Sequence, residues 1–137
     1  YLHPSPRLDE GVWLQAQPSV HAMMDISDGL LPDARHIAKA SGVGIDLLTA
    51  QFPSSVFLGS YWAEQGMECT PQRLCSGEEY ELMVIVGVEE APTLLQQFMT
   101  LFDVAIHPVG VCSDRPGEVL VDGAAPAMQG FEHFRAP

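Results

Sequence analysis

Residues 20–42 read VHAMMDISDGLLPDARHIAKASG, and this stretch decides the fold. Its first seven residues are mostly apolar, which predicts a buried strand. Apolar residues then recur at helical spacing to about residue 40, which predicts a helix. Pro32 fits only in the first turn of this helix, and Gly42 is typical of the end of one. The stretch therefore predicts a strand, a tight turn and a helix in direct succession.

The predicted turn, residues 25–29, carries two carboxylates and a hydroxyl. Such oxygen ligands suit Mg²⁺, which prefers one or two carboxylates together with phosphates and water. Backbone N–H groups at the start of the helix could also meet a phosphate. The alternative is a plain capping turn, because Asp28 or Ser27 is the expected N-cap of the helix. Asp25 favours a functional site, since a carboxylate that closes an apolar strand is unfavourable unless it has a partner.

The rest of the chain alternates strands and helices without a strict repeat. The apolar run at 80–88 is continuous, which predicts a strand buried on both faces and central in a sheet. We therefore predict an α+β domain with a mixed β-sheet and packed helices. Further strands are predicted over 43–48, 104–111 and 118–121, and further helices over 7–16, 57–64 and 89–102.

Two more clusters of polar or aromatic residues could bind a ligand. Residues 76–82 (SGEEYEL) place three glutamates around a tight turn that Gly77 permits. These acids either contact a metal or a ligand, or form a solvated acidic loop. Residues 130–134 (GFEHF) place aromatic rings near the chain end. These rings either anchor the tail to the core or stack on a ligand.

Composition excludes several classes of function. The formal net charge is −12, with six Lys and Arg residues in all, so the chain lacks the cation clusters that bind nucleic acid. No apolar run approaches the roughly 18 to 20 residues that span a bilayer, so we expect no membrane partner. Cys69, Cys75 and Cys112 form no CxxC pair, which suits a reducing cytoplasm. P-loop, GxGxxG, GxSxG and HExxH motifs are absent. A phosphate site here needs divalent metal, or cations from another domain.

Taken together, the motifs resemble those of thiamine-monophosphate kinases, in that family's order and over nearly the whole chain. The chain departs from the family motif GG(E/D)DYEL at two positions. Ser76 replaces the first Gly of the motif, and Glu79 replaces its Asp. The similar segments are residues 24–30 (MDISDGL) with Asp33, residues 36–38 (HIA) and residues 40–44 (ASGVG), then residues 76–82, residues 130–134, and residues 4–7, which are similar to the segment that joins the family's two domains.

This resemblance implies a fold, an activity and a domain arrangement. Residues 1–18 would be an interdomain linker and first helix. Residues 19–137 would form a C-terminal domain like that of the PurM (AIR-synthetase-like) superfamily. The N-terminal ATP-binding domain would be absent from this chain. The implied enzyme is a phosphotransferase of thiamine biosynthesis, which transfers the γ-phosphoryl of ATP to thiamine monophosphate with Mg²⁺ and forms thiamine diphosphate.

The resemblance also implies roles for individual residues. Asp25 and Asp28 would be metal ligands, and Ser27 would contact ATP. Glu78 would contact thiamine monophosphate, and Phe131 would lie against its ring system. No residue of this chain is assigned a catalytic role of its own. The physical reading agrees, because phosphoryl transfer depends on positioning and charge neutralisation more than on covalent chemistry.

The resemblance further implies a homodimer for the full-length protein, and no kinase activity for this chain alone, because half of the site would be missing. Two alternatives remain open at this point. One is another ATP-dependent enzyme of the same superfamily with a different acceptor. The other is a non-catalytic domain that binds a ligand or a partner chain, which Ser76 favours and the intact turn at residues 25–29 does not.

Overall fold

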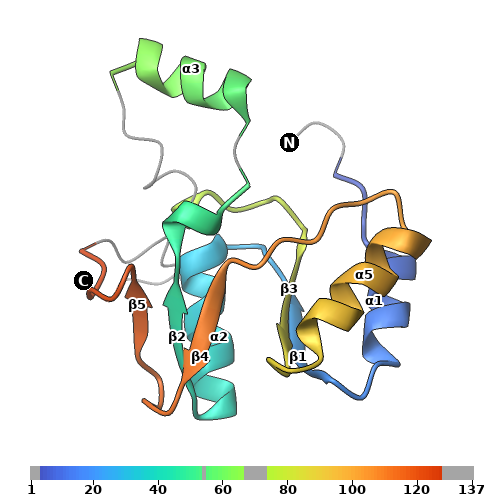
Figure 1. Ribbon diagram of the computed structural model, residues 1–137. Coiled ribbons are helices and arrows are strands. Elements are labelled where there is room, and N and C mark those ends of the chain that lie inside the picture. Colours follow the sequence, from blue (N-terminus) through green and yellow to red (C-terminus); the bar gives the residue numbers. More distant parts are fainter. Residues whose placement is uncertain (1–3, 54, 67–73, 128–137) are drawn as a thin grey trace.

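The computed structural model describes residues 4–53, 55–66 and 74–127 (Figure 1). The α+β class is confirmed, since helices alternate with strands of both parallel and antiparallel pairing. The elements are α1 (Leu8–Gln15), β1 (Val20–Asp25), α2 (Leu30–Ser41), β2 (Gly44–Leu47), the short 3₁₀ helix η1 (Thr49–Gln51), α3 (Val56–Glu64), β3 (Leu82–Val86), α5 (Ala91–Leu101), β4 (Gly110–Ser113) and β5 (Val119–Val121).

The strands form two small sheets instead of one. β1 and β3 pair antiparallel, with Asp25 opposite Leu82 at one end. In the second sheet β2 lies between β4, which is antiparallel to it, and β5, which is parallel. The connection from β4 to β5 is a loop too short for a helix, as predicted.

The prediction that residues 80–88 form a central strand is wrong for the described part of the chain, where β3 pairs with β1 alone. Its apolar run has another cause. Met83 packs into the cluster under α2, whereas Leu82, Val84 and Val86 pack into the cluster with α1 and α5. Because helices cover both faces of a two-stranded ribbon, its strand is as apolar as a central one.

The predicted strand over 104–111 is also misplaced, since the observed strand is β4 at Gly110–Ser113. Val104 and Ile106 pack against the cluster of α1 and α5 instead of joining a ladder. Pro108 follows them and has no N–H to donate. The side chains of this segment are therefore used for packing, and pairing begins only beyond the proline.

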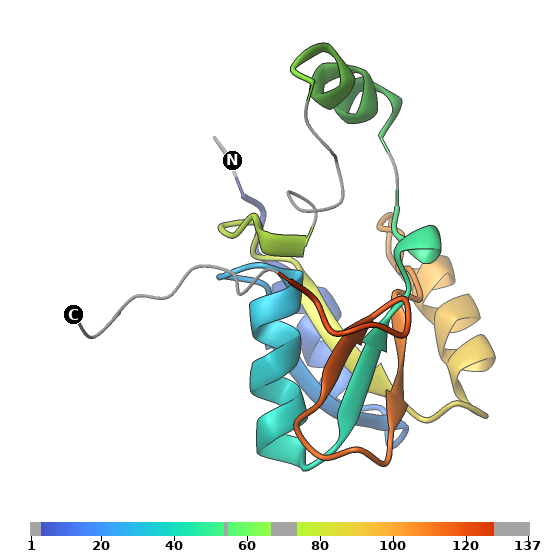
Figure 2. The same cartoon turned by 90° about the vertical axis from the view of Figure 1, so that its left-hand side faces the viewer.

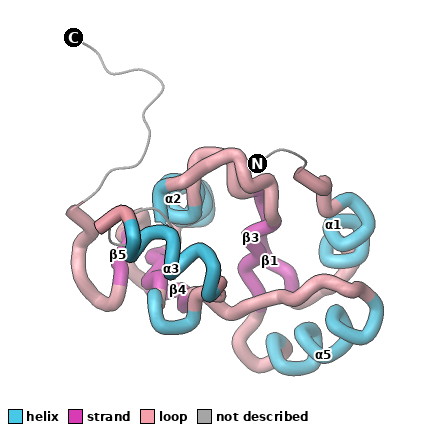
Figure 3. The backbone as a smooth tube through the Cα atoms, turned by 90° about the horizontal axis from the view of Figure 1, so that it is seen from above, coloured by secondary structure: helices cyan, strands magenta, loops and turns pink. Residues whose placement is uncertain are grey.

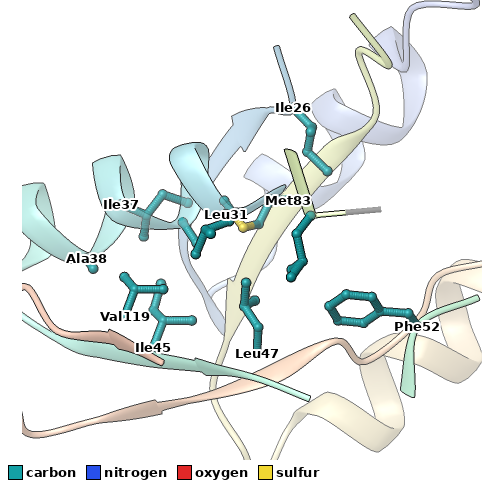
Figure 4. Close-up of a cluster of buried hydrophobic side chains, with 11 residues drawn as sticks. Ile26, Leu31, Ile37, Ala38, Ile45, Leu47, Phe52, Met83 and Val119 are labelled. Atoms are coloured by element: carbon teal, nitrogen blue, oxygen red, sulfur yellow. The ribbon is translucent and has the colours of Figure 1, made fainter. Parts of the chain in front are cut away.

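Helix α2 is the centre of the larger core. Its Leu31, Ala34 and Ala38 are fully buried, and they pack with side chains from both sheets (Figure 4). Ile45 and Val119 come from the second sheet and lie beside the helix. Figure 2 shows α2 running alongside β2 and β5. The first turn of α2 is consequently held in a fixed place relative to the ends of β1 and β3.

A smaller cluster covers the other face of the β1–β3 ribbon. Leu14 of α1 and Leu94 and Phe98 of α5 are its buried members, and the two helices lie on the same side of the ribbon (Figure 3). Trp13 meets Phe98 edge to face, with ring centroids 6.0 Å apart, a favoured aromatic geometry.

Helix α3 stands away from the rest of the molecule (Figures 1 and 2). Val56 and Phe57, at its start, are 82% and 89% exposed. In the described residues, no helix combines the length and the apolar character needed to cross a membrane.

Candidate functional site

The turn between β1 and α2 is built around the carboxylate of Asp33. This side chain is 1% exposed. Its Oδ2 atom accepts hydrogen bonds from the backbone N–H groups of Ser27, Asp28 and Gly29, at 2.9, 3.0 and 3.2 Å. A buried carboxylate needs such donors, because charge without partners is strongly unfavourable away from water. Asp33 therefore determines the path of the chain through the turn.

The predicted N-cap of α2 is wrong. The N-cap residue is Gly29, and no side chain caps the helix from that side. Asp33, the fourth residue of the helix, reaches back instead and accepts the N–H of Gly29 together with those of the two residues before it. The N–H groups of the turn are thus engaged with Asp33, and a phosphate contact at the first helical N–H groups stays a prediction. The side chains of Ser27 and Asp28 are not needed for capping.

Gly29 must be glycine for two reasons. Its φ angle is +118°, which side-chain-bearing residues rarely adopt. A Cβ atom at this position would also lie 3.0 Å from the backbone of Cys75. The segment that leads into the acidic loop therefore packs directly on the turn.

The acidic loop, residues 76–81, is joined to the turn by backbone hydrogen bonds. The N–H of Glu78 donates to the carbonyl of Ser27 at 2.8 Å, and the N–H of Tyr80 donates to the carbonyl of Ile26 at 2.9 Å. At Gly77 a Cβ atom would lie 2.3 Å from the oxygen of Ser27. Two clusters about 50 residues apart in the sequence are thus brought into one site.

The acidic loop contains an unusual backbone. Glu78 and Tyr80 have φ angles of +64° and +54°, in the left-handed region that non-glycine residues seldom occupy. Such conformations persist only where the surroundings impose them, and they cluster at binding sites. Here the two hydrogen bonds to residues 26 and 27 impose them. The side chain of Glu78 is exposed at the turn.

The two residues that depart from the family motif are bonded to each other. The hydroxyl of Ser76 donates to Oε1 of Glu79 at 3.2 Å. Burial raises the pKa of the Glu79 carboxyl, the charge of Glu81 raises it further, and the Ser76 hydrogen bond opposes both. Ser76 therefore stabilises the longer carboxylate that Glu79 brings into the loop.

One group of side chains in the described residues has the spacing of a metal site. Asp28, Asp33 and His36 each offer a ligand atom, and the three atoms lie within 4.8 Å of one another. Oδ2 of Asp33 is committed to the turn, so this carboxylate can offer only its other oxygen. Asp28 is an oxygen donor of the kind that Mg²⁺ prefers, whereas the nitrogen of His36 is not. The donor set thus fits Mg²⁺ through carboxylates.

The structure places four of the five residues singled out from the sequence around this turn. Asp25 is exposed at the end of β1 but does not belong to the group above, and Ser27 and Asp28 are half-buried beside it. Phe131 lies outside the described residues. Sequence reasoning missed His36 as a neighbour of the turn, although its i+3 spacing from Asp33 puts both on one helix face.

The fold is shared with solved structures of several proteins, although no family model matches the chain. HypE of Escherichia coli superposes with a TM-score of 0.73 at 18% identity, and the match covers 98% of this chain and 41% of that one. At this identity the likeness concerns the fold alone. The chain is therefore a PurM-like α+β domain.

More similar proteins define the family. The structure of AaThiL complexed with AMPPCP and TMP superposes with a TM-score of 0.79 at 31% identity, covering 97% of this chain and 39% of that one. The thiamine-monophosphate kinase of Aquifex aeolicus is 34% identical over 134 residues, which is 98% of this chain and 40% of the relative. That of Mycobacterium tuberculosis H37Rv is 32% identical over 139 residues, 100% and 38%.

The chain belongs to the thiamine-monophosphate kinase family, which confirms the resemblance read from its motifs. It spans about two fifths of the length of the curated relatives it matches.

Replacing the buried anchor tests its role in the turn. Asp33→Asn removes the charge that accepts three backbone N–H groups, so we expect the free energy of unfolding to fall by about 1–3 kcal/mol. Asp114→Asn, at an exposed aspartate, is the control and changes it by less than about 0.5 kcal/mol. Urea unfolding of both variants measures the difference, and equal stabilities would contradict the anchoring role.

The close approach of the acidic loop to the turn is tested at Gly77. Gly77→Ala places a methyl group against the oxygen of Ser27, and we expect a loss of about 1–3 kcal/mol in unfolding free energy. Gly59→Ala adds the same methyl to α3, where no atom lies within 4 Å, and gains about 0.5–1 kcal/mol from helix propensity. Thermal unfolding in which both variants shift in the same direction would refute the contact.

Proposed function

We propose that this chain is the C-terminal domain of an ATP-dependent kinase that phosphorylates thiamine monophosphate to thiamine diphosphate. The observation that carries the proposal is that backbone hydrogen bonds join the turn at residues 25–29 to the acidic loop, in a chain of this family. The solved structure of AaThiL, which shares the fold at 31% identity, is complexed with AMPPCP, an ATP analogue, and TMP. Both ligands therefore belong to the proposal for this chain.

In this proposal the turn binds metal and nucleotide. Asp25 and Asp28 hold Mg²⁺ and Ser27 contacts ATP. The metal, when bound, neutralises the negative charge of the phosphates and orients them. The anchor at Asp33 supports these roles, because its hydrogen bonds to the backbone of Ser27 and Asp28 hold this turn in one conformation.

The acidic loop contacts the acceptor in this proposal. Glu78 is exposed, and its backbone N–H is hydrogen-bonded to the carbonyl of Ser27. An acceptor bound at Glu78 therefore lies next to the turn that holds metal and nucleotide. The carboxylate of Glu78 can bind an amine or a positively charged ring of the acceptor. Phe131 stacks on the ring system of thiamine monophosphate, as the family resemblance implies.

A second domain completes the site in this proposal. Residues 1–18 are the linker and first helix, residues 19–137 are the C-terminal domain, and the remaining part, an N-terminal ATP-binding domain, forms a homodimer. Relatives more than twice as long as this chain support the division. The isolated chain is inactive, and the enzyme works in the cytoplasm.

The test is an assay of the complete gene product with ATP, Mg²⁺ and thiamine monophosphate. We expect thiamine diphosphate to form. Asp28→Asn should lower kcat/KM by about 10²- to 10³-fold, since it removes charge that holds the metal against the phosphates. Asp114→Asn should leave kcat/KM within about twofold.

Three outcomes contradict parts of this proposal. Turnover of a different acceptor, with none of thiamine monophosphate, would refute the substrate. Absence of ATP turnover with any acceptor would favour a non-catalytic binding domain. Turnover by the isolated 137-residue chain would refute the need for a second domain.

A further inference from the structure

Arg7, just before α1, forms a bidentate ion pair with Glu81. Its Nε donates to Oε2 of Glu81 at 2.9 Å and its Nη2 donates to Oε1 at 2.8 Å, across 74 positions of sequence. Nη1 also lies 3.7 Å from a carboxylate oxygen of Glu10. Paired hydrogen bonds of this kind fix orientation as well as adding energy. The pair therefore ties the segment before α1 to one particular residue of the site loop.

Glu81 occupies the position where the ribbon ends and the candidate site begins. Its carbonyl accepts the N–H of Ile26 at 2.8 Å, and the N–H of the preceding residue, Tyr80, donates to the carbonyl of Ile26. Two residues before Tyr80 is Glu78, in its left-handed conformation. A displacement of Glu81 would consequently be passed along the backbone to Glu78.

The loop also needs a cation for electrostatic reasons. Glu78, Glu79 and Glu81 lie within four residues of one another, and the charge of Glu81 adds to burial, the main cause, in raising the pKa of the Glu79 carboxyl. The side chain of Arg7 is 24% exposed and that of Glu81 is 47% exposed, so water screens the pair only in part. Arg7 supplies such a cation through its ion pair with Glu81.

We propose that Arg7 is a positioning residue of the substrate site. It holds Glu81, keeps the acidic loop on the turn at residues 25–29, and so fixes where Glu78 points. It also links the loop to the segment that leads into α1. The functional half of this inference rests on the function proposed above, whereas the structural half stands on the ion pair and can be tested alone.

The structural half is tested by hydrogen exchange on the gene product. In Arg7→Ala we expect the amides of Glu78 and Tyr80 to exchange about fivefold faster or more, because their hydrogen bonds open more often. The amides of Leu48 and Asp122, which bond in the other sheet, keep their rates. Arg115→Ala breaks a comparable exposed pair, Arg115 with Glu118 at 2.9 Å, and is the control that leaves the loop unchanged.

The functional half is tested by steady-state kinetics. Arg7→Ala and Glu81→Gln should each raise KM for thiamine monophosphate by about 3- to 10-fold, while kcat and KM for ATP stay within about twofold. The double variant should be no worse than either single one, since both remove one interaction. Arg7→Lys keeps the charge without the bidentate geometry and should fall in between.

The two halves fail in different ways. Unchanged hydrogen exchange at the amides of Glu78 and Tyr80, or equal acceleration in Arg115→Ala, would overturn the claim that the Arg7–Glu81 pair holds the loop. Faster exchange with unchanged KM, or additive losses in the double variant, would overturn the positioning role. A wild-type gene product that does not phosphorylate thiamine monophosphate overturns the proposed function. The exchange measurement still decides whether the Arg7–Glu81 pair holds the loop.

Discussion

The buried carboxylate of Asp33 is the interaction on which the site depends. The backbone N–H groups of Asp28 and Gly29 lie just before α2, and a side chain from inside the helix accepts them. The same oxygen also accepts the N–H of Ser27, so it determines the path of the chain before the helix begins. Because α2 is itself packed under both sheets, the turn inherits the rigidity of the core.

A second constraint is the fit of the acidic loop against that turn. Gly29 and Gly77 let two backbones approach to distances that a side chain would prevent. The ladder of β1 and β3 continues into the hydrogen bonds from Glu78 and Tyr80, so the loop is an extension of the ribbon. The chain gathers acids here although its net charge is already −12. Arg7 and bound metal are the two means of compensating this charge that the proposals assign.

Local patterns predicted the parts of this fold that depend on local chemistry. Pro32 and Gly42 bound α2 as expected, because each restricts the backbone at its own position. The anchor at Asp33 was missed, because the capping box places the side chain that reaches back at the third helical position, and Asp33 is the fourth. The apolar run of β3 led to the wrong prediction of a central strand. Helices that cover both faces of a strand favour the same apolar residues as a central position in a sheet. The contact of the turn with the loop depends on chain topology, which no local pattern specifies. The role assigned to Phe131 stays a prediction.

The most direct test of the turn as the metal and nucleotide site is paramagnetic broadening by Mn²⁺, which substitutes for Mg²⁺ at oxygen ligands. In the gene product with ATP, the amide signals of residues 25–29 and of Glu78 should broaden most strongly, and Asp28→Asn should remove that effect. Broadening that is strongest elsewhere, or that persists unchanged in Asp28→Asn, would contradict a metal site at this turn.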